Sequence, residues 1–444
     1  MKKIINAVDK YRSLILDSER YLWKHPETGY REWKSSAYME KIFEDLGYGI
    51  TRAENIPGFY TLIDTGREGP TVMILSELDA LICRTHPECD PDTGAVHACG
   101  HHAQCAAMVG IAAALKEPGV LDSFNGKIKL CVVPAEELLE IGYRRELRQK
   151  GIIKYFGGKA EFMSRGYFDD VDIAFMAHTS GGFSVGLGSV GCVAKEIVFK
   201  GKSAHAGGSP WAGVNALYAA TCGINAANAM RETFKDSDLI RFHPIITHGG
   251  EVVNAIPERV NVESYVRGKT FDAIRSANAK INRALCGAAL SVGANVEILD
   301  VPGYAPLTNC EALVEAAADA SPKVLGDIQF KVGSGISSGS TDMGDLCMVM
   351  PAMHPYVGGA EGHGHGNDYR IADPELACVM SAKWQLAVLL ELLGNGALRA
   401  KQIISEFVPQ FESKGAYIDY LESIFTQGDR ITYNEDGFVS VNLK

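Results

Sequence analysis

Three short, uninterrupted apolar runs constrain the fold of this chain more than any other feature. They read Val72-Met73-Ile74-Leu75, Lys129-Leu130-Cys131-Val132-Val133 and Ile173-Ala174-Phe175-Met176-Ala177. Runs of this kind suit parallel strands whose two faces are both covered by helices. An alanine-rich, helix-like stretch, 103–115, separates the first two runs, and residues 8–24 also carry apolar side chains at helical spacing. We therefore predict an α/β domain with a mixed, mostly parallel sheet flanked by helices.

The pattern changes between about residues 186 and 300. In chain order the predicted elements are a strand with one wet face at 193–199, a helix at 214–230, a strand at 259–266, a helix at 273–289 and a strand at 295–299. This alternation predicts an inserted α+β domain. We divide the chain into 1–185, 186–300 and 301–444, where the first and third parts form one domain and the third carries a C-terminal tail.

Charge and composition exclude several classes of partner. The chain has 444 residues and a formal net charge of -11, so it lacks the basic surface that neutralises the phosphates of nucleic acid. The N-terminal apolar residues are interrupted by Asn6, Asp9 and Lys10, unlike a signal peptide. No stretch approaches the roughly 18 uncharged apolar residues of a membrane span. Eleven scattered cysteines indicate reduced thiols. We expect a cytoplasmic protein.

A dense group of ligand-type side chains follows the first run, in the segment His97-Ala98-Cys99-Gly100-His101-His102. Cys99 and His101 can face one point because a single glycine separates them. Thiolate and imidazole are good ligands for borderline-soft divalent metals. The alternative is a buried cysteine beside a histidine that caps the following helix.

The other two apolar runs also end in ligand-type side chains. Glu136 and Glu137 follow the second run, where buried carboxylates are costly unless they are paired or bind a metal. Because successive side chains of a strand point to opposite faces, one glutamate could bind a metal while the other acts as a base. His178 follows the third run. A solvated glutamate pair and a structural histidine are the alternatives, but three successive strand ends favour one shared site.

Three more histidines, His354, His363 and His365, lie near the C-terminus. Glycines on both sides of His363 and His365 would let the backbone approach a site closely. One of these histidines could complete a metal site, and the choice between His363 and His365 stays open.

Taken in order, these segments resemble one known family. They are His25-Pro26-Glu27-Thr28-Gly29, Glu77-Leu78-Asp79-Ala80-Leu81, His97-Ala98-Cys99-Gly100-His101, Pro134-Ala135-Glu136-Glu137, Ser203-Ala204-His205-Ala206, Gly213-Val214-Asn215-Ala216-Leu217, Asn254-Ala255-Ile256-Pro257, Ser340-Thr341-Asp342 and His365 with Tyr369. The family is the amidohydrolase branch of the aminoacylase/carboxypeptidase-type dinuclear metallopeptidases. It includes hippurate hydrolase, indole-acetyl-amino-acid hydrolase, aminobenzoyl-glutamate hydrolase and Xaa-Arg dipeptidase-like proteins.

The resemblance implies a catalytic α/β domain with an inserted lid that forms a homodimer. It implies two divalent metal ions held by Cys99 (as a bridge), His101, Glu137, His178 and His365. A Cys/His/carboxylate set suits Zn most readily, while Mn, Co and Ni remain alternatives. Glu136 would be the general base, Asp79 would orient His101 through its other ring nitrogen, and His205 and Asn254 would reach the substrate across the dimer interface.

The expected substrate is a small N-acyl amino acid or dipeptide-like amide. Such molecules carry a carboxylate, and Arg267, at the end of the strand at 259–266, offers a planar fork that matches one. An ordinary surface arginine is the alternative. The chain departs from the family at His102, which stands where relatives often have Asp, and at Glu77, where they often read Asp-x-Asp.

Two other functions are compatible with parts of the sequence. Gly335-Ile336-Ser337-Ser338-Gly339 matches the nucleophile motif of a serine hydrolase and follows a strand-like segment, 328–332, with Asp342 and His365 downstream. This hypothesis leaves the metal-type residues unexplained. A catalytically inactive homologue that binds a small molecule is the second alternative, although all the residues that catalysis needs are present.

Overall fold

The three apolar runs form neighbouring strands of one six-stranded sheet in the computed structural model, which describes residues 1–443. The strands, in spatial order, are β1 (Thr51–Arg52), β2 (Phe59–Asp64), β6 (Lys127–Val133), β3 (Thr71–Glu77), β7 (Ile173–Phe175) and β19 (Ala352–Met353). The β6–β3, β3–β7 and β7–β19 pairs are parallel, and the β1–β2 and β2–β6 pairs are antiparallel. The predicted mixed, mostly parallel sheet is therefore confirmed.

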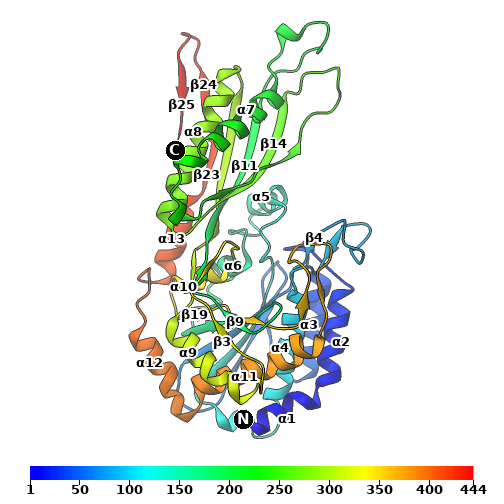
Figure 1. Ribbon diagram of the computed structural model, residues 1–444, viewed down its shortest axis with the longest axis vertical. Helices are drawn as coiled ribbons and strands as arrows, with labels where there is room; N and C mark the ends of the chain where they lie inside the picture. Colours follow the sequence, from blue (N-terminus) through cyan, green and yellow to red (C-terminus); the bar gives the residue numbers. More distant parts are fainter. Residues whose placement is uncertain (444) are drawn as a thin grey trace.

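Helices cover both faces of this sheet (Figure 1). Alternate side chains of one strand enter two different cores: Val72 and Ile74 of β3 pack on one face, and Met73 and Leu75 on the other. The first face is covered by α1 (Lys2–Lys10), α2 (Arg12–Trp23), α3 (Trp33–Asp45), α4 (His101–Leu115), α9 (Glu311–Ala320) and α11 (Ser381–Leu393). The second is covered by α5 (Ile141–Gln149), α6 (Gly158–Ser164), α10 (Met343–Cys347) and α13 (Lys414–Ile424). We call this unit the main domain.

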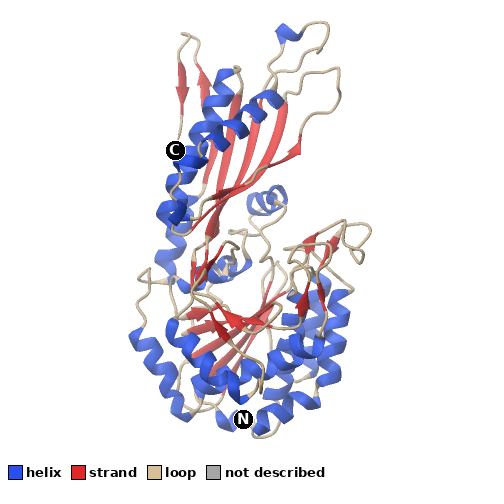
Figure 2. Cartoon of the chain, viewed as in Figure 1, coloured by secondary structure: helices blue, strands red, loops and turns tan. Residues whose placement is uncertain are grey.

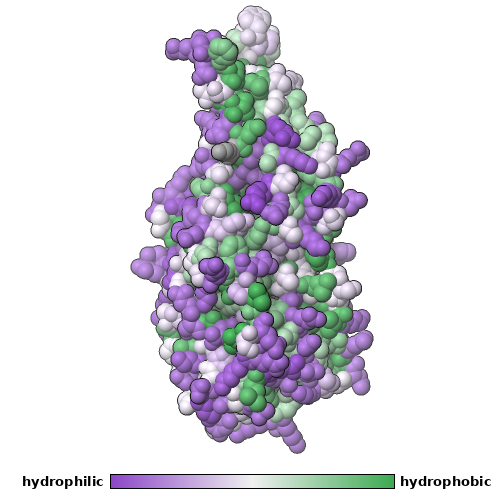
Figure 3. Space-filling model, turned by 90° about the vertical axis from the view of Figure 1, so that its left-hand side faces the viewer, coloured by the Kyte–Doolittle hydropathy of each residue, from purple (hydrophilic) through white to green (hydrophobic). Residues whose placement is uncertain are grey.

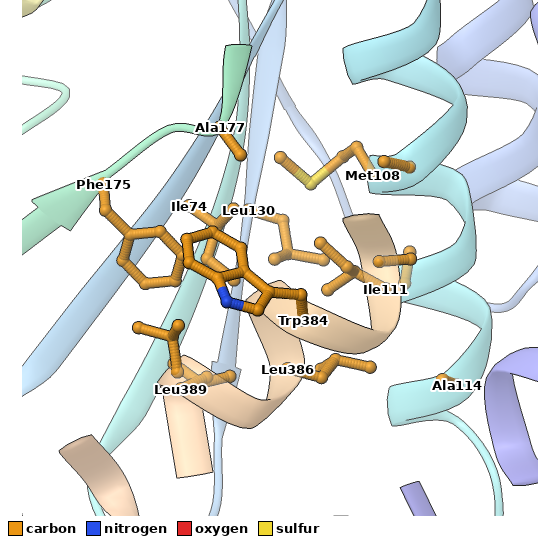
Figure 4. Close-up of a cluster of buried hydrophobic side chains, with 14 of the residues drawn as sticks. Ile74, Met108, Ile111, Ala114, Leu130, Phe175, Ala177, Trp384, Leu386 and Leu389 are labelled. Atoms are coloured by element: carbon orange, nitrogen blue, oxygen red, sulfur yellow. The ribbon is translucent and has the colours of Figure 1, made fainter. Parts of the chain in front are cut away.

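Trp384 of α11 lies at the centre of the larger core. Figure 4 shows its ring beside Phe175 and Ile74 of the sheet, with Met108 of α4 close by. The indole is fully buried and its Nε1 donates a hydrogen bond of 2.9 Å to Ser321 Oγ. Of the described residues, one helical stretch, Glu375–Leu393, is long and apolar enough to cross a membrane, but 72% of its most apolar part is buried inside the protein. Its apolar side chains belong to the larger core of the main domain.

The N-terminal helix differs from its prediction at 8–24. The structure has two helices there, α1 and α2, because the chain leaves helical geometry at Tyr11, whose φ and ψ are -103° and 14°. The apolar spacing continues across Tyr11, so periodicity alone does not reveal the break.

A second sheet forms above the main domain, and we call it, with its helices, the lid (residues 191–304). In spatial order its strands are β12 (Arg241–Phe242), β14 (Arg259–Gly268), β11 (Gly191–Lys200), β15 (Asn295–Tyr304) and β23 (Thr426–Asp429), and β13 (Ile245–His248) also pairs with β14. The two long helices α7 (Ala216–Ala229) and α8 (Phe271–Ser291) pack together on one face of this sheet, as Figure 2 shows.

The prediction of a wet face on residues 193–199 is wrong. Every residue of β11 up to Phe199 is buried. The charged side chains that suggested a wet face have partners: Lys195 forms an ion pair with Asp300, and Glu196 accepts a hydrogen bond of 2.6 Å from Arg145 of α5. Sequence shows the charges but not the partners that allow them to be buried.

The C-terminal tail was predicted to accompany the third chain part, 301–444, of the main domain. Instead, after α12 (Leu398–Glu406) and α13, strand β23 joins the lid sheet beside β15, and β24 (Ile431–Tyr433) and β25 (Val439–Val441) form a hairpin. The tail therefore connects both parts of the molecule. The tail carries exposed apolar side chains, among them Phe438 at 74% exposure. Figure 3 shows hydrophobic residues, in green, on the upper part of the face that is on the left in Figure 1.

The remaining strands are short and surround the upper edge of the main sheet. They are β4 (Leu81–Ile82), β5 (Ala95–Val96), β8 (His178–Thr179), β9 (Ser184–Val185), β10 (Gly188–Ser189), β16 (Leu307–Thr308), β17 (Lys331–Val332), β18 (Ile336–Ser337), β20 (Tyr356–Val357), β21 (Ala360–Glu361) and β22 (Arg370–Ile371). The strand predicted at 328–332 is thus reduced to the two residues of β17.

Candidate metal centre

The four parallel strands of the main sheet all deliver ionisable side chains to the same edge. Glu77 ends β3, the Glu136-Glu137 pair follows β6, His178 follows β7 and His354 follows β19. Parallel strands bring their carboxyl ends together, and this is where α/β sheets build their sites.

Cys99 and His101 reach the same edge from the turn before α4. Gly100, between them, has a φ of +88°, which only glycine adopts without strain. A side chain there would also collide with Thr179 Oγ1, 2.0 Å from the position of its Cβ. The glycine therefore lets the chain turn sharply, so that the thiol and the imidazole on either side of it face one place.

Two groups of three ligand atoms form around Cys99. The first consists of Cys99, His101 and His178, and the second of Cys99, Glu137 and His365; within each group the ligand atoms lie within 4.8 Å of one another. Cys99 Sγ is 3.3 Å from His178 Nε2, and His365 Nε2 is 3.0 Å from Glu137 Oε1. A thiol shared by two such groups can bridge two divalent metals.

Buried atoms without hydrogen bonds support this assignment. His101 Nε2 and Glu137 Oε1 are buried and make no hydrogen bond of good geometry, although Glu77 Oε2 lies 3.2 Å from the first and His365 Nε2 lies 3.0 Å from the second. Buried polar atoms in this state are costly unless a cation binds them. Sulfur, imidazole nitrogen and carboxylate oxygen together are a donor set that suits zinc and its neighbours in the periodic table. The residues present therefore fit two divalent ions.

The electrostatics prepare the thiol and the carboxylate for this role. Burial opposes the ionisation of Cys99, but the charges on His178 and His101 outweigh it and lower the thiol pKa to about 6. Burial also opposes the ionisation of Glu137, yet the neighbouring His365 lowers its pKa to about 2. Both side chains are thus anionic at neutral pH, the form in which they bind metals.

Asp79 connects the two ligand groups. One of its carboxylate oxygens, Oδ1, lies 3.1 Å from His101 Nδ1, and the other, Oδ2, accepts a hydrogen bond of 2.7 Å from the backbone N–H of Glu137. The contact to Nδ1 directs Nε2 of His101 toward Cys99 and His178. A carboxylate in this position fixes both the ring orientation and the tautomer of the histidine.

The loop that carries Glu136 and Glu137 is held by buried charged groups. Ala135 has a positive φ of 58°, and its N–H donates a 2.7 Å hydrogen bond to Glu32. Arg144 of α5, which is 1% exposed, donates to the carbonyl oxygen of Glu137. The turn lies beyond the end of β6, so both glutamates line the same cavity rather than opposite faces of a strand.

A cavity of about 290 Å³ opens onto these residues. Cys99, both glutamates, His178 and His365 form its metal-binding side. The lid contributes Arg267 and Tyr265 of β14 to the same cavity. The site therefore lies between the main domain and the lid.

Comparison with known proteins decides the family. Residues 73–384, well over half of the chain, match the model of peptidase family M20/M25/M40. The chain belongs to this family. It is therefore a hydrolase that acts on amide or peptide bonds.

Individual relatives agree with this assignment. The chain is 28% identical to the Xaa-Arg dipeptidase of Mus musculus over 370 residues, which cover 80% of this chain and 79% of the relative. It is 28% identical to the N-acetyl-L-cysteine deacetylase of Bacillus subtilis over 331 residues, 70% of this chain and 72% of the relative. The fold is similar to that of a dinuclear metal binding M20 peptidase from Bacillus subtilis, with a TM-score of 0.62 and 20% identity over 87% of this chain and 99% of the other.

In this M20 protein His365, and not His363, lies in the second ligand group. His363 is exposed and lies 2.8 Å from Asp368, whereas His365 reaches Glu137 and Cys99. His102 points away from the cluster, with Nε2 3.2 Å from Glu19. His354 lines the cavity near His178 but belongs to neither ligand group, and burial lowers its pKa to about 3.

Two predicted substrate residues lie elsewhere in the same chain. His205 and Asn254 are exposed on the lid segments 201–215 and 249–258 and do not line the cavity. Their segments lie side by side, because Ala206 N–H donates to Asn254 O at 2.9 Å.

The geometry gives no support to a serine nucleophile. Ser337 lines the cavity, but its Oγ accepts a hydrogen bond from the N–H of Gly339, and no helix follows until α10 begins at Met343. A nucleophile elbow needs a strand, a tight turn and a helix in direct succession. Asp342 pairs with Lys159, and His365 with Glu137, so neither is arranged as a triad partner.

The sequence interpretation missed several residues of the site. Lys159 and Arg144 are fully buried cations whose partners come from distant segments. Tyr304, which donates to the carbonyl oxygen of Glu136, was also missed. The one local signal was Gly157-Gly158 before Lys159, which indicates a close approach of the backbone.

Replacing each of the two competing histidines tests the ligand assignment. We expect His365→Ala to lose close to one metal per chain, because it removes one of only three donors from the second group. The matched variant His363→Ala should retain the native metal content, since its side chain is exposed. Metal analysis after exhaustive dialysis measures both, and equal metal loss in the two variants would contradict the assignment.

Proposed function

We propose that this protein hydrolyses the amide bond of a small N-acyl amino acid or dipeptide-like substrate. One observation carries the proposal: two metal-ligand groups share Cys99 beside a cavity of about 290 Å³ that also contains Glu136 and Arg267. The cavity suits a small molecule rather than a protein. The named activities of the two relatives, dipeptide cleavage and deacetylation of an amino acid, both break an amide bond next to an amino acid.

The proposed cofactor is a pair of divalent ions, with zinc as the first choice, and Mn, Co or Ni as alternatives. Cys99, His101 and His178 would hold one ion, and Cys99, Glu137 and His365 the other. Such ions lower the pKa of water to about 7 and polarise the scissile carbonyl.

Glu136 is the proposed general base. Its carboxylate lines the cavity, and one of its oxygens lies within 4.8 Å of ligand atoms of His101 and Glu137. Burial, followed by the charges of Glu77 and Glu137, raises its pKa well above the ordinary value, which strengthens it as a proton acceptor once ionised. It would take a proton from water and pass it to the leaving amine.

Glu136→Gln tests this role. We expect the variant to keep its metal content and lose at least about 10²-fold in kcat, because an amide cannot accept the proton. Glu146→Gln, on the exposed side of α5, is the matched control and should behave like the native enzyme. A Glu136→Gln enzyme with near-native kcat on any cleaved substrate would remove Glu136 from the mechanism.

Arg267 is the proposed reader of the substrate carboxylate. It reaches the cavity from the end of β14, and its Nη1 donates a hydrogen bond of 2.8 Å to Ser340 Oγ. Its Nε is buried and makes no hydrogen bond. Ser340 thus holds the guanidinium through Nη1, while the Nε–H still lacks an acceptor and is suited to bind a planar carboxylate.

The Arg267→Ala variant should discriminate between acids and amides. We expect KM to rise about 10- to 100-fold for substrates with a free carboxylate and much less for the matching amides, because only the acids lose a charged hydrogen bond. Asn254→Ala should act in the same direction more weakly. Equal changes for acids and amides, measured with one pair of substrates, would show that neither residue reads the carboxylate.

A homodimer would bring His205 and Asn254 to a cavity. The strand β13 lies at the edge of the lid sheet with Ile245 62% exposed, and Tyr218 of α7, also in the lid, is 64% exposed. An exposed apolar edge strand is a natural surface for pairing with another chain. His205 Nδ1 accepts hydrogen bonds from Gly207 and Gly208, so its Nε2 carries a proton that can be donated to a developing oxyanion.

Mixing two inactive variants tests this arrangement. The His205→Ala chain lacks the residue that would reach its partner's cavity, and the Glu136→Gln chain lacks the proposed base of its own cavity. In a mixed dimer, one cavity therefore combines a native Glu136 with a native His205. We expect activity to appear when the two variants are unfolded and refolded together, but not when each is refolded alone. Failure of the mixture to gain activity, or a monomer in sedimentation at micromolar concentration, would contradict the shared site.

We also propose a cytoplasmic location. All eleven cysteines are free thiols, six of them buried, which suits a reducing compartment.

A further inference from the structure

A second acidic cluster adjoins the metal centre. Glu77, Glu136 and Asp342 each offer a carboxylate oxygen, and these atoms lie within 4.8 Å of one another. Glu77 and Asp342 are fully buried and Glu136 is 7% exposed. Carboxylate oxygens in such a group are typical ligands of hard divalent cations such as Mg²⁺ and Mn²⁺.

A side chain of the protein, Lys159, supplies the cation that pairs with this cluster. Lys159 Nζ forms ion pairs with both Glu77 and Asp342, and the lysine is fully buried. Despite the burial, the charges of Asp342 and Glu77 raise the pKa of Lys159 above its ordinary value, so the side chain remains an ammonium at neutral pH.

The backbone holds Lys159 in place. Its N–H donates a hydrogen bond of 2.9 Å to Asp342 Oδ2. At the preceding residue, Gly158, a Cβ would lie 1.7 Å from the carbonyl oxygen of Pro134, so α6 begins in direct contact with the loop that carries Glu136. The lysine is therefore fixed at both its backbone and its ammonium group.

Glu136 belongs to two sets of neighbours at once. It lies beside His101 and Glu137 on the side of the metal centre, and beside Glu77 and Asp342 on the side of Lys159. A divalent ion bound between Glu77, Glu136 and Asp342 would occupy the carboxylate that the proposed mechanism needs for proton transfer. The Lys159 ammonium leaves the Glu136 carboxylate more available, because its ion pairs are with Glu77 and Asp342.

We propose that Lys159 is a positioning residue: a tethered cation that excludes a third divalent ion and thereby leaves Glu136 free to act as a base. The consequence for Glu136 rests on the proposed function, whereas the exclusion of the ion does not. Lys159 also holds Glu77, whose Oε2 lies 3.2 Å from His101 Nε2 and accepts a hydrogen bond of 3.0 Å from Gln104. Removing the ammonium leaves three carboxylates together, and like charges at this distance repel unless another cation binds.

Counting bound ions tests the proposal. Native protein and the Lys159→Met, Lys159→Arg and Lys159→Met/Asp342→Asn variants are equilibrated with millimolar Mn²⁺ and analysed for metal. We expect Lys159→Met to bind one more Mn²⁺ per chain than the native protein. Lys159→Arg retains a cation and should bind no extra ion, and the double variant lacks one carboxylate and should lose the extra ion again.

Turnover gives a second readout. Excess Mn²⁺ should inhibit Lys159→Met progressively, with a fall in kcat rather than a rise in KM, and should leave Lys159→Arg no more sensitive than the native enzyme. An unchanged ion count in Lys159→Met over the whole Mn²⁺ range would overturn the proposal. So would an extra ion that persists in the double variant.

Poor folding of Lys159→Met would not prevent the test. In that case thermal unfolding is followed with and without Mn²⁺, and the proposal predicts a larger rise in Tm for Lys159→Met than for Lys159→Arg or the double variant. Equal rises in all three would overturn it. Because these measurements compare ion binding between variants without substrate, they stand even if Glu136 proves not to be the base.

Discussion

Glu77, Asp79, Glu136, Glu137 and Asp342 crowd one edge of the main sheet, and none of them is more than 7% exposed. Buried carboxylates are tolerated only when cations or hydrogen-bond donors satisfy them. Four of the five have such a partner: Lys159 for Glu77 and Asp342, the Glu137 N–H and His101 for Asp79, and His365 for Glu137. Much of the surrounding architecture follows from this requirement, including the glycine-lined approach of α6 and the buried Arg144 in α5.

Most of the residues that gather at the candidate metal centre could be predicted because their signals are local. Glu137 and His178 follow apolar strands, Cys99 and His101 are separated by one glycine, and parallel strands bring such ends together. The choice of His365 over His363 needed the structure, because the two histidines lie two residues apart in a glycine-rich loop. They therefore have the same local sequence context. What separates them is which ring meets Glu137 and Cys99.

The errors share a physical cause, which is that a sequence does not show long-range partners. Lys195 and Glu196 indicated a wet face, yet Asp300 and Arg145 allow them to be buried. Lys159 was overlooked because its partners lie more than 80 residues away in each direction. The strand β23 was missed for the same reason, since a polar segment gains its place in the lid only by pairing with β15. The tail thereby ties the lid to the main domain, with Tyr417 of α13 donating to the buried Asp345.

The bridging position of Cys99 is the central claim, and anomalous diffraction from crystals grown with zinc measures it most directly. The account predicts two anomalous peaks, about 3.5–4 Å apart, on either side of Cys99 Sγ. One peak should lie next to His101 and His178, and the other next to Glu137 and His365. A single peak, or two peaks of which neither contacts Cys99, would contradict the account.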